Sequence, residues 1–442
     1  IIDSTFMKNV TTFLLCIFSG IVLAKADSPN AAPAGTNLLT LAAAEQIALK
    51  NHPQIAAANY RALAAQEAAK ATRSGYFPQA NLVVDAVGAN DEGTRIMAGG
   101  LNNPSIYDRA AGGLQVSQLL TDFGRTGNLT ASSKLQAQAE NQNANLTREQ
   151  VLLQVNVGFF SALKAQAVLR VAQQTFDTRK LLLDKVTLLA SNKLKSELDV
   201  SFARVAVEEA RLLLQKAQNN SDAAMTSLAT ALGFREPQPF QLVEQTKAIN
   251  ATTNDVSQLV ETALASRPEL LSLRDARDAA LHFAKSQRDS RLPTISAVGA
   301  AGYAPTHDDN LPDDYAAGGI QLSLPLFAGG FYTARQHEAE LKAQADDELL
   351  RSAEDNIVRD VHLASLNLNN ALEQLQTTQD LVRNADEAYD LAEARYKVGS
   401  SSIVELSQAQ LSLASAQIAD ASARYDVFIQ QADLNYQIGA LR

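Results

Sequence analysis

The feature that most constrains this chain is that its two halves repeat each other. Pro53 and Pro268 each lie inside a helical pattern, 215 residues apart. Residues 114–233 then align with residues 320–439 at an offset of 206 without a gap, so the first half carries a longer loop after Pro78. A repeat this long predicts a duplicated half-protein with an internal two-fold repeat, not a solenoid of short units.

The N-terminus resembles a secretory signal peptide. Met7-Lys8 precedes an apolar run over residues 13–23, and Ala24-Lys25-Ala26 forms an A-x-A cleavage site. We expect residues 1–26 to be removed, together with Cys16, the one cysteine in the sequence. Beyond this run we expect no membrane-spanning helix. The net charge of −10 disfavours nucleic acid as a partner.

Helical periodicity dominates the rest of the chain. Apolar residues recur at every seventh position in two series, which predicts coiled-coil packing of long helices at about 125–190 and 332–396. At ~1.5 Å per residue, each helix would be roughly 100 Å long. Each is followed by a turn and a shorter returning helix, and further helices at about 40–73 and 255–289 precede the β segments. The two series are Val155, Ala162, Leu169, Phe176, Leu183 and Ala190, and Val361, Leu368, Leu375, Val382, Tyr389 and Tyr396.

Four short segments have the alternation of β-strands, at about 79–90, 113–120, 294–303 and 319–326. One face is apolar and the other is small or polar, as in a membrane barrel, although a strand of a soluble sandwich looks the same. Four strands cannot close a barrel, and open edges are not tolerated in lipid, so several chains must share one. Three chains would supply twelve strands. Pro78, Pro293 and Pro325 mark the transitions between helix and strand.

These elements predict a mainly α fold with a small β part. The helices would form long antiparallel hairpins, and four strands per chain would contribute to a shared twelve-stranded transmembrane β-barrel. We expect a first repeat over residues 27–235, a linker over 236–254 and a second repeat over 255–442.

Two motifs carry a family resemblance. Residues 395–406, Arg-Tyr-Lys-Val-Gly-Ser-Ser-Ser-Ile-Val-Glu-Leu, match an R-Y-x-x-G-x-x-[ST]-x-x-[DE]-[VL] signature, and residues 325–330 resemble a P-L-F-x-G-G strand exit. With the signal peptide and the duplicated order of elements, the whole mature chain resembles the TolC family of outer-membrane efflux proteins.

The resemblance implies a homotrimer in the outer membrane of a Gram-negative bacterium, with the helical hairpins forming an α-barrel that extends into the periplasm. It would be a passive exit duct for efflux or type I secretion, docking a periplasmic adaptor and an inner-membrane RND or ABC pump. Asp199, Tyr396 and Glu405 would lie at the closing constriction, where carboxylates would form a ring of negative charge. Ser401 replaces an arginine that ties the tip shut in some members, and Gln408 replaces a further acidic residue. The docking turns would comprise Lys193, Lys195, Ser196, Val398, Gly399, Ser400 and Ser402.

Other chemistry has little support in the sequence. The five histidines form no spaced metal pair, no phosphate loop or nucleophile elbow is present, and we expect neither cofactor nor catalysis. The acidic loop 308–314 is either a solvated surface loop or a divalent-ion site. Lys193 and Lys195 are either solvated charges or substitute partners for the tip carboxylates. The rival classes are a periplasmic hairpin adaptor and a coiled-coil scaffold without a channel, and the sequence identifies neither the exported cargo nor the pump.

Overall fold

The computed structural model describes residues 38–87, 109–236, 238–244, 255–306 and 312–441. The expected signal peptide, strand residues 88–90, most of the first-half loop and linker residues 245–254 lie outside this part of the chain, as do Asp308 and Asp309. Residues 39–442 form one compact unit, and the description below concerns that unit.

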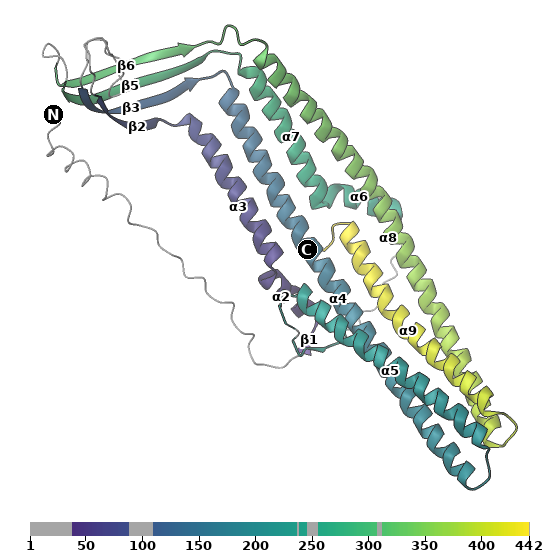
Figure 1. Ribbon diagram of the computed structural model, residues 1–442. Coiled ribbons are helices and arrows are strands. Elements are labelled where there is room, and N and C mark those ends of the chain that lie inside the picture. Colours follow the sequence, from purple (N-terminus) through teal and green to yellow (C-terminus); the bar gives the residue numbers. More distant parts are fainter. Residues whose placement is uncertain (1–37, 88–108, 237, 245–254, 307–311, 442) are drawn as a thin grey trace, which may run out of the picture. The chain divides into compact units, whose positions relative to one another are not determined.

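Two long helical hairpins dominate the unit (Figure 1). The first consists of α4 (Arg125–Ser191) and α5 (Glu197–Ala231), with 67 and 35 residues, and the second of α8 (Phe331–Lys397) and α9 (Ile403–Gln437), also with 67 and 35 residues. The long helices therefore extend one or two residues beyond the predicted ranges. Unexpectedly, α4 contains a stretch long and apolar enough to cross a membrane, but 44% of it is buried inside the unit, and core helices pass the same test.

The helices before the sheet are each broken at a proline, contrary to the continuous helices predicted over 40–73 and 255–289. The first is divided into α2 (Leu41–Asn51) and α3 (Pro53–Arg73), and the second into α6 (Val256–Ser266) and α7 (Pro268–Asp289). His52 and Arg267, which precede the prolines, have extended backbones with ψ of 122° and 124°. Proline disfavours the helical conformation of the residue before it, so each helix ends there and a new one begins at the proline.

One antiparallel sheet joins the two halves in the order β2-β3-β5-β6 (Figure 1). Its strands are β2 (Gln79–Val87), β3 (Arg109–Thr121), β5 (Thr294–Thr306) and β6 (Asp314–Ser323). The predicted bounds were wrong for β6, which begins five residues before Gly319 and ends before Pro325. Strands β3 and β5 are also longer than predicted, since β3 begins at Arg109 and β5 ends at Thr306. Ser323 pairs with Thr294, the first residue of β5, and Pro325 has no backbone N–H with which to extend the ladder, so the strand stops at Ser323. Gly318 and Gly319 lie within β6.

The strand register gives the sheet two unlike faces. Leu82 lies opposite Leu114 on one face, and the neighbouring Asn81 lies opposite Gln115 on the other. The apolar face is exposed in this chain: Leu82 and Ile320 are each 75% exposed. On the other face, Ser296 of β5 pairs with Gln321 of β6. The predicted two-sided character of the strands is therefore present across the sheet.

The linker between the halves packs against the middle of the helices. Its described part contains β4 (Gln241–Leu242), and the Val243 amide next to it donates a hydrogen bond of 3.0 Å to the Leu39 carbonyl in β1 (Leu38–Leu39). Phe240 and Leu242 pack on a core that includes Phe159 of α4, Leu228 of α5 and Tyr425 of α9. The Tyr425 hydroxyl donates a hydrogen bond of 2.8 Å to Glu244. The linker thus contacts both hairpins.

Candidate gate at the helical tips

Four helices meet at the tips of the hairpins in one apolar cluster. Val186 of α4, Val200 of α5, Tyr396 of α8 and Leu406 of α9 belong to it, and each is at most 8% exposed. These side chains come from both hairpins and from positions some 200 residues apart. The cluster therefore holds the two tips of one chain against each other, and the predicted gate residues lie around it.

The first tip is a tight turn between α4 and α5. Lys193 has a left-handed backbone with φ 61°, where a residue with a Cβ is rarely found. Ser196 and Asp199 form a capping box: the Asp199 amide donates to the Ser196 hydroxyl at 3.1 Å, and the Asp199 carboxylate accepts from the Ser196 amide at 3.0 Å. The carboxylate of Asp199 is therefore used to begin α5.

The second tip places Gly399 in the same left-handed region, with φ 79°, and Ser402 caps α9 by accepting from the Glu405 amide at 3.3 Å. The Glu405 carboxylate accepts a hydrogen bond of 2.7 Å from the Ser401 hydroxyl. It also forms an ion pair of 3.0 Å with Arg395. Glu405 therefore has a positive partner and a hydroxyl donor within its own hairpin, rather than being a bare negative charge.

Tyr396 is the large buried residue of the tips, at 8% exposed. Its hydroxyl is buried and has no hydrogen-bond partner among the described residues. Burial, with a smaller contribution from the negative charge of Asp199, raises the pKa of the phenol above its ordinary value of 10.0. The Lys195 ammonium lies 4.1 Å from the centre of the Tyr396 ring, a cation–π contact between the first tip and the second.

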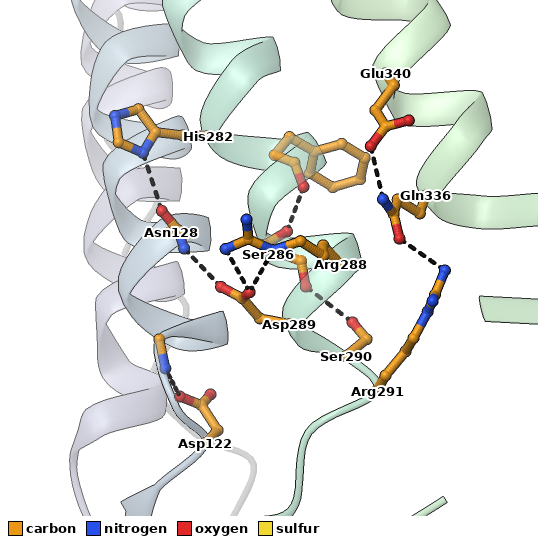
Figure 2. A network of polar contacts seen from close by, with 12 residues as sticks. Asp122, Asn128, His282, Ser286, Arg288, Asp289, Ser290, Arg291, Gln336 and Glu340 are labelled. Atoms are coloured by element: carbon orange, nitrogen blue, oxygen red, sulfur yellow. Dashed lines mark hydrogen bonds and ion pairs between the residues drawn. The ribbon is translucent and has the colours of Figure 1, made fainter. Parts of the chain in front are cut away.

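A polar network lies at the opposite end of the long helices, next to the sheet (Figure 2). His282 Nδ1 lies 3.1 Å from Asn128 Oδ1, and Asn128 Nδ2 donates to Asp289 at 2.8 Å. Because the Asn128 oxygen can only accept, this geometry places a proton on His282 Nδ1. Asp122 caps the start of α4 by accepting from the Thr126 amide at 2.7 Å. The network fixes α7 on the first turn of α4.

The structure brings together only some of the residues that the sequence singled out. Tyr396, Asp199 and Lys195 lie together at the tips, and Ser401 contacts Glu405. The side chain of Gln408 is exposed, and so are those of Lys193, Ser196, Ser400 and Ser402 in the docking turns, with Val398 at 79%. Pro78 and Pro293 directly precede β2 and β5, and Pro325 follows β6.

Sequence reasoning missed the partner of Glu405. Arg395 belongs to the signature at residues 395–406 and lies in the last turn of α8, where a cation is well placed to pair with a carboxylate in the first turn of the next helix. The sequence also left open whether Lys195 has a partner. In the described structure it lies against Tyr396, while no metal-binding group of three His, Cys, Asp or Glu residues is found among the described residues.

Solved outer-membrane channels share this architecture of long helical hairpins carrying one small antiparallel sheet. Residues 45–234 and 259–440 match the family model described as "Outer membrane efflux protein". The chain belongs to the outer membrane efflux protein family, which confirms the resemblance found in the sequence.

Individual proteins agree with this assignment. The chain is 26% identical over 396 residues to outer membrane protein TolC of Salmonella enteritidis, covering 86% of this chain and 77% of TolC. It is 25% identical over 313 residues to the proteases secretion protein PrtF of Dickeya chrysanthemi, covering 68% of this chain and 66% of PrtF. CusC, whose crystal structures concern folding and transmembrane channel formation, has the same fold. The TM-score is 0.78 at 19% identity, over 90% of this chain and 92% of CusC.

Proposed function

We propose that this protein is the outer-membrane exit duct of a tripartite efflux or type I secretion system. It would conduct small molecules or polypeptides passively from an inner-membrane pump across the periplasm and the outer membrane. The names of TolC and PrtF, an outer membrane protein and a protease secretion protein, support this function. Family membership supports a transport role rather than catalysis.

The observation that carries the proposal is the sheet β2-β3-β5-β6. One face exposes Leu82 and Ile320, each 75% exposed, whereas the other face carries Asn81, Gln115 and Gln321. An apolar outer face and a polar inner face are what a barrel wall needs in lipid. Strands β2 and β6 are the two edges of the described sheet. In a membrane the outward backbone groups of an edge strand must pair, so β6 of one copy would pair with β2 of the next.

Three copies with four strands each would close a twelve-stranded barrel. The long hairpins, as duplicated units, would then form the wall of a tunnel across the periplasm. The tips, with Tyr396, Asp199 and Glu405, would form its gate, and the turns around Lys193 and Gly399 would dock a periplasmic adaptor and an RND or ABC pump. The equal lengths of α4 and α8 and of α5 and α9 support this duplication.

Disulfide trapping between edge strands tests the assembly. One cysteine would be placed in β2 and one in β6, both on the polar face, and the protein would be oxidised in outer membranes. The β2 variants are Asn81→Cys and Val83→Cys, and the β6 variants are Ala317→Cys, Gly319→Cys and Gln321→Cys. We expect at least one pair to give a covalent trimer on denaturing gels. The control combines Gln115→Cys with Gln321→Cys, because β3 is an inner strand and cannot reach a neighbouring copy. Monomers from every β2–β6 pair, with no threefold particles by electron microscopy in detergent, would refute the shared barrel.

A further inference from the structure

The contact between Lys195 and Tyr396 joins the two hairpins of the chain. Lys195 lies in the turn between α4 and α5, and Tyr396 lies in the last turn of α8. The ammonium is 4.1 Å from the ring centre, and Lys195 is only partly exposed. An ammonium at this distance over a tyrosine ring is attracted by the negative face of the π system.

The two tip carboxylates are engaged within their own hairpins. Asp199 accepts hydrogen bonds from the amide and hydroxyl of Ser196, at 3.0 and 2.9 Å. Glu405 is bound by Arg395 at 3.0 Å and by Ser401 at 2.7 Å. These contacts stabilise each turn but do not tie one turn to the other. The Lys195 contact differs because its two groups come from different hairpins.

The geometry assigns the attraction to the aromatic ring rather than to the hydroxyl. The Tyr396 ring is buried against Val186, Val200 and Leu406, while its hydroxyl has no hydrogen-bond partner among the described residues. A contact that depended on the phenol O–H would place a hydrogen-bond donor or acceptor next to the Tyr396 hydroxyl. Burial of the ring lowers the local dielectric and so strengthens the interaction with the ammonium.

The offset between the halves adds an independent observation. At 206 residues, Lys195 corresponds to Ser401, and Ala190 corresponds to Tyr396. The first tip thus has the cation, Lys195, but an alanine at the position of the ring. The second tip has the ring, Tyr396, but a serine at the position of the cation. The two tips are therefore complementary in this contact rather than equivalent.

We propose that Lys195 is the latch residue of the gate, that is, the residue whose contact keeps the gate closed. Its ammonium binds the Tyr396 ring and holds the first tip against the second, and this contact must break before the duct opens. This inference rests on the proposed function and names the side chain that regulates it. A partner that opens the duct would have to offer Lys195 a better site, such as a carboxylate, or displace the first turn.

The test is single-channel recording of purified protein in planar bilayers. Lys195→Gln removes the charge and keeps most of the side chain. The loss of one cation–π contact should raise the ratio of open to closed tips roughly two- to thirtyfold for each chain of the trimer, and the factors multiply if the three chains open together. Lys195→Arg should restore the closed state, because guanidinium also binds aromatic faces. The matched control is Lys185→Gln, which removes an exposed lysine from the same hairpin outside the turn.

Two backgrounds separate the ring from the hydroxyl. In Tyr396→Phe the ring remains, so Lys195→Gln should raise the ratio by the same factor as in the wild type. In Tyr396→Leu no ring remains, so Lys195→Gln should have no further effect. An undiminished effect of Lys195→Gln in the Tyr396→Leu background would overturn the latch, and so would a wild-type channel that Lys195→Gln leaves unchanged. Wild-type protein that inserts but never conducts would instead overturn the duct itself.

Discussion

Glu405 illustrates how single residues acquire roles that their sequence position does not reveal. The sequence predicts a carboxylate in the first turn after the tip, and so a ring of negative charge in an assembled duct. The structure adds Arg395 at 3.0 Å, with the side chains of Arg395 and Glu405 58% and 44% exposed. Such a pair contributes on the order of 1 kcal/mol or less to stability, but it offsets the negative charge of Glu405. In the proposed gate, ion selectivity would then depend on Arg395 as much as on Glu405.

His52 should make stability depend on pH. Its Nδ1 accepts a hydrogen bond of 3.3 Å from the Gln54 amide, which caps α3, and burial lowers the pKa of the imidazole below 6.5. A lowered pKa means that the unfolded chain binds the proton more readily, so stability is full above pH 6.5 and falls as the pH drops through the folded-state pKa.

We expect acidification from pH 7.5 to pH 5 to cost about 1 kcal/mol through the lost cap. His52→Asn keeps an N-cap acceptor that does not titrate, so this part of the pH dependence should disappear. Thermal unfolding at the two pH values measures it in both proteins. Equal pH dependence in the wild type and in His52→Asn would assign the effect to other groups.

The difference between Arg395 and Lys195 shows where sequence reasoning stops at the residue scale. Arg395 and Glu405 are ten residues apart across a turn that the sequence predicts, so their pairing could have been inferred. Lys195 and Tyr396 are some 200 residues apart, and their contact depends on how two hairpins pack. A repeat offset relates equivalent positions, but it does not say which pairs of non-equivalent positions touch.

At the scale of elements, Gly233 and Gly439 end the returning helices against the broken helices at Pro53 and Pro268. Both have left-handed backbones, with φ of 86° and 71°. A Cβ at Gly233 would lie 3.0 Å from the Asn51 carbonyl oxygen, and one at Gly439 would lie 2.8 Å from the Ser266 hydroxyl oxygen. Each glycine thus allows a helix end to approach the bend made by the proline.

Gly233→Ala should therefore destabilise the protein more than Gly399→Ala. Both alanines would have to adopt a left-handed conformation, which costs roughly 1–2 kcal/mol. Only Gly233→Ala also forces a Cβ against the Asn51 backbone, since Gly399 has nothing within 4 Å, and that crowding should add about 1–3 kcal/mol. Urea unfolding followed by circular dichroism would compare the two, and equal losses would show that the close approach is unimportant.

Helices were easier to predict than the other elements, for physical reasons. The strong apolar period of the two 67-residue helices constrains where each helix begins and ends. The observed ends lie within two residues of the predicted positions. The period was misleading across Pro53 and Pro268, where local backbone sterics outweigh an otherwise helical pattern. Strand β6 was placed too late because its start contains Ala316, Ala317 and Gly318, which carry no alternation, and only pairing with β5 identifies them.

At the scale of the whole molecule, α4 connects the two halves. It packs against α3 and α5 of its own half and against α7 and α9 of the other. Phe160 of α4 and Phe428 of α9 stack with ring centres 5.0 Å apart and planes at 12°. Nearby, Lys164 pairs with Asp426 at 2.8 Å. The halves are thus interlocked, rather than two independent domains joined by a linker.

Phe428→Ala should therefore weaken both halves together. For half-buried rings we expect a loss of about 2 kcal/mol, with a coupling of about 0.5–1.5 kcal/mol between Phe160→Ala and Phe428→Ala. A double-mutant cycle by urea unfolding measures the coupling, and one cooperative transition is expected in every variant. Additive losses, or separate transitions for the two halves, would contradict interlocked packing.

The first tip has a further consequence for how such a protein diverges after duplication. Lys193 occupies, at the offset of 206, the place of Gly399, and it holds the same left-handed turn at φ 61° without the freedom that glycine has. One copy of the turn has the residue that adopts this conformation easily, and the other adopts it with a side chain and a charge. The same backbone turn thus joins helices of equal length in both halves while presenting a bare glycine in one half and an ammonium group in the other.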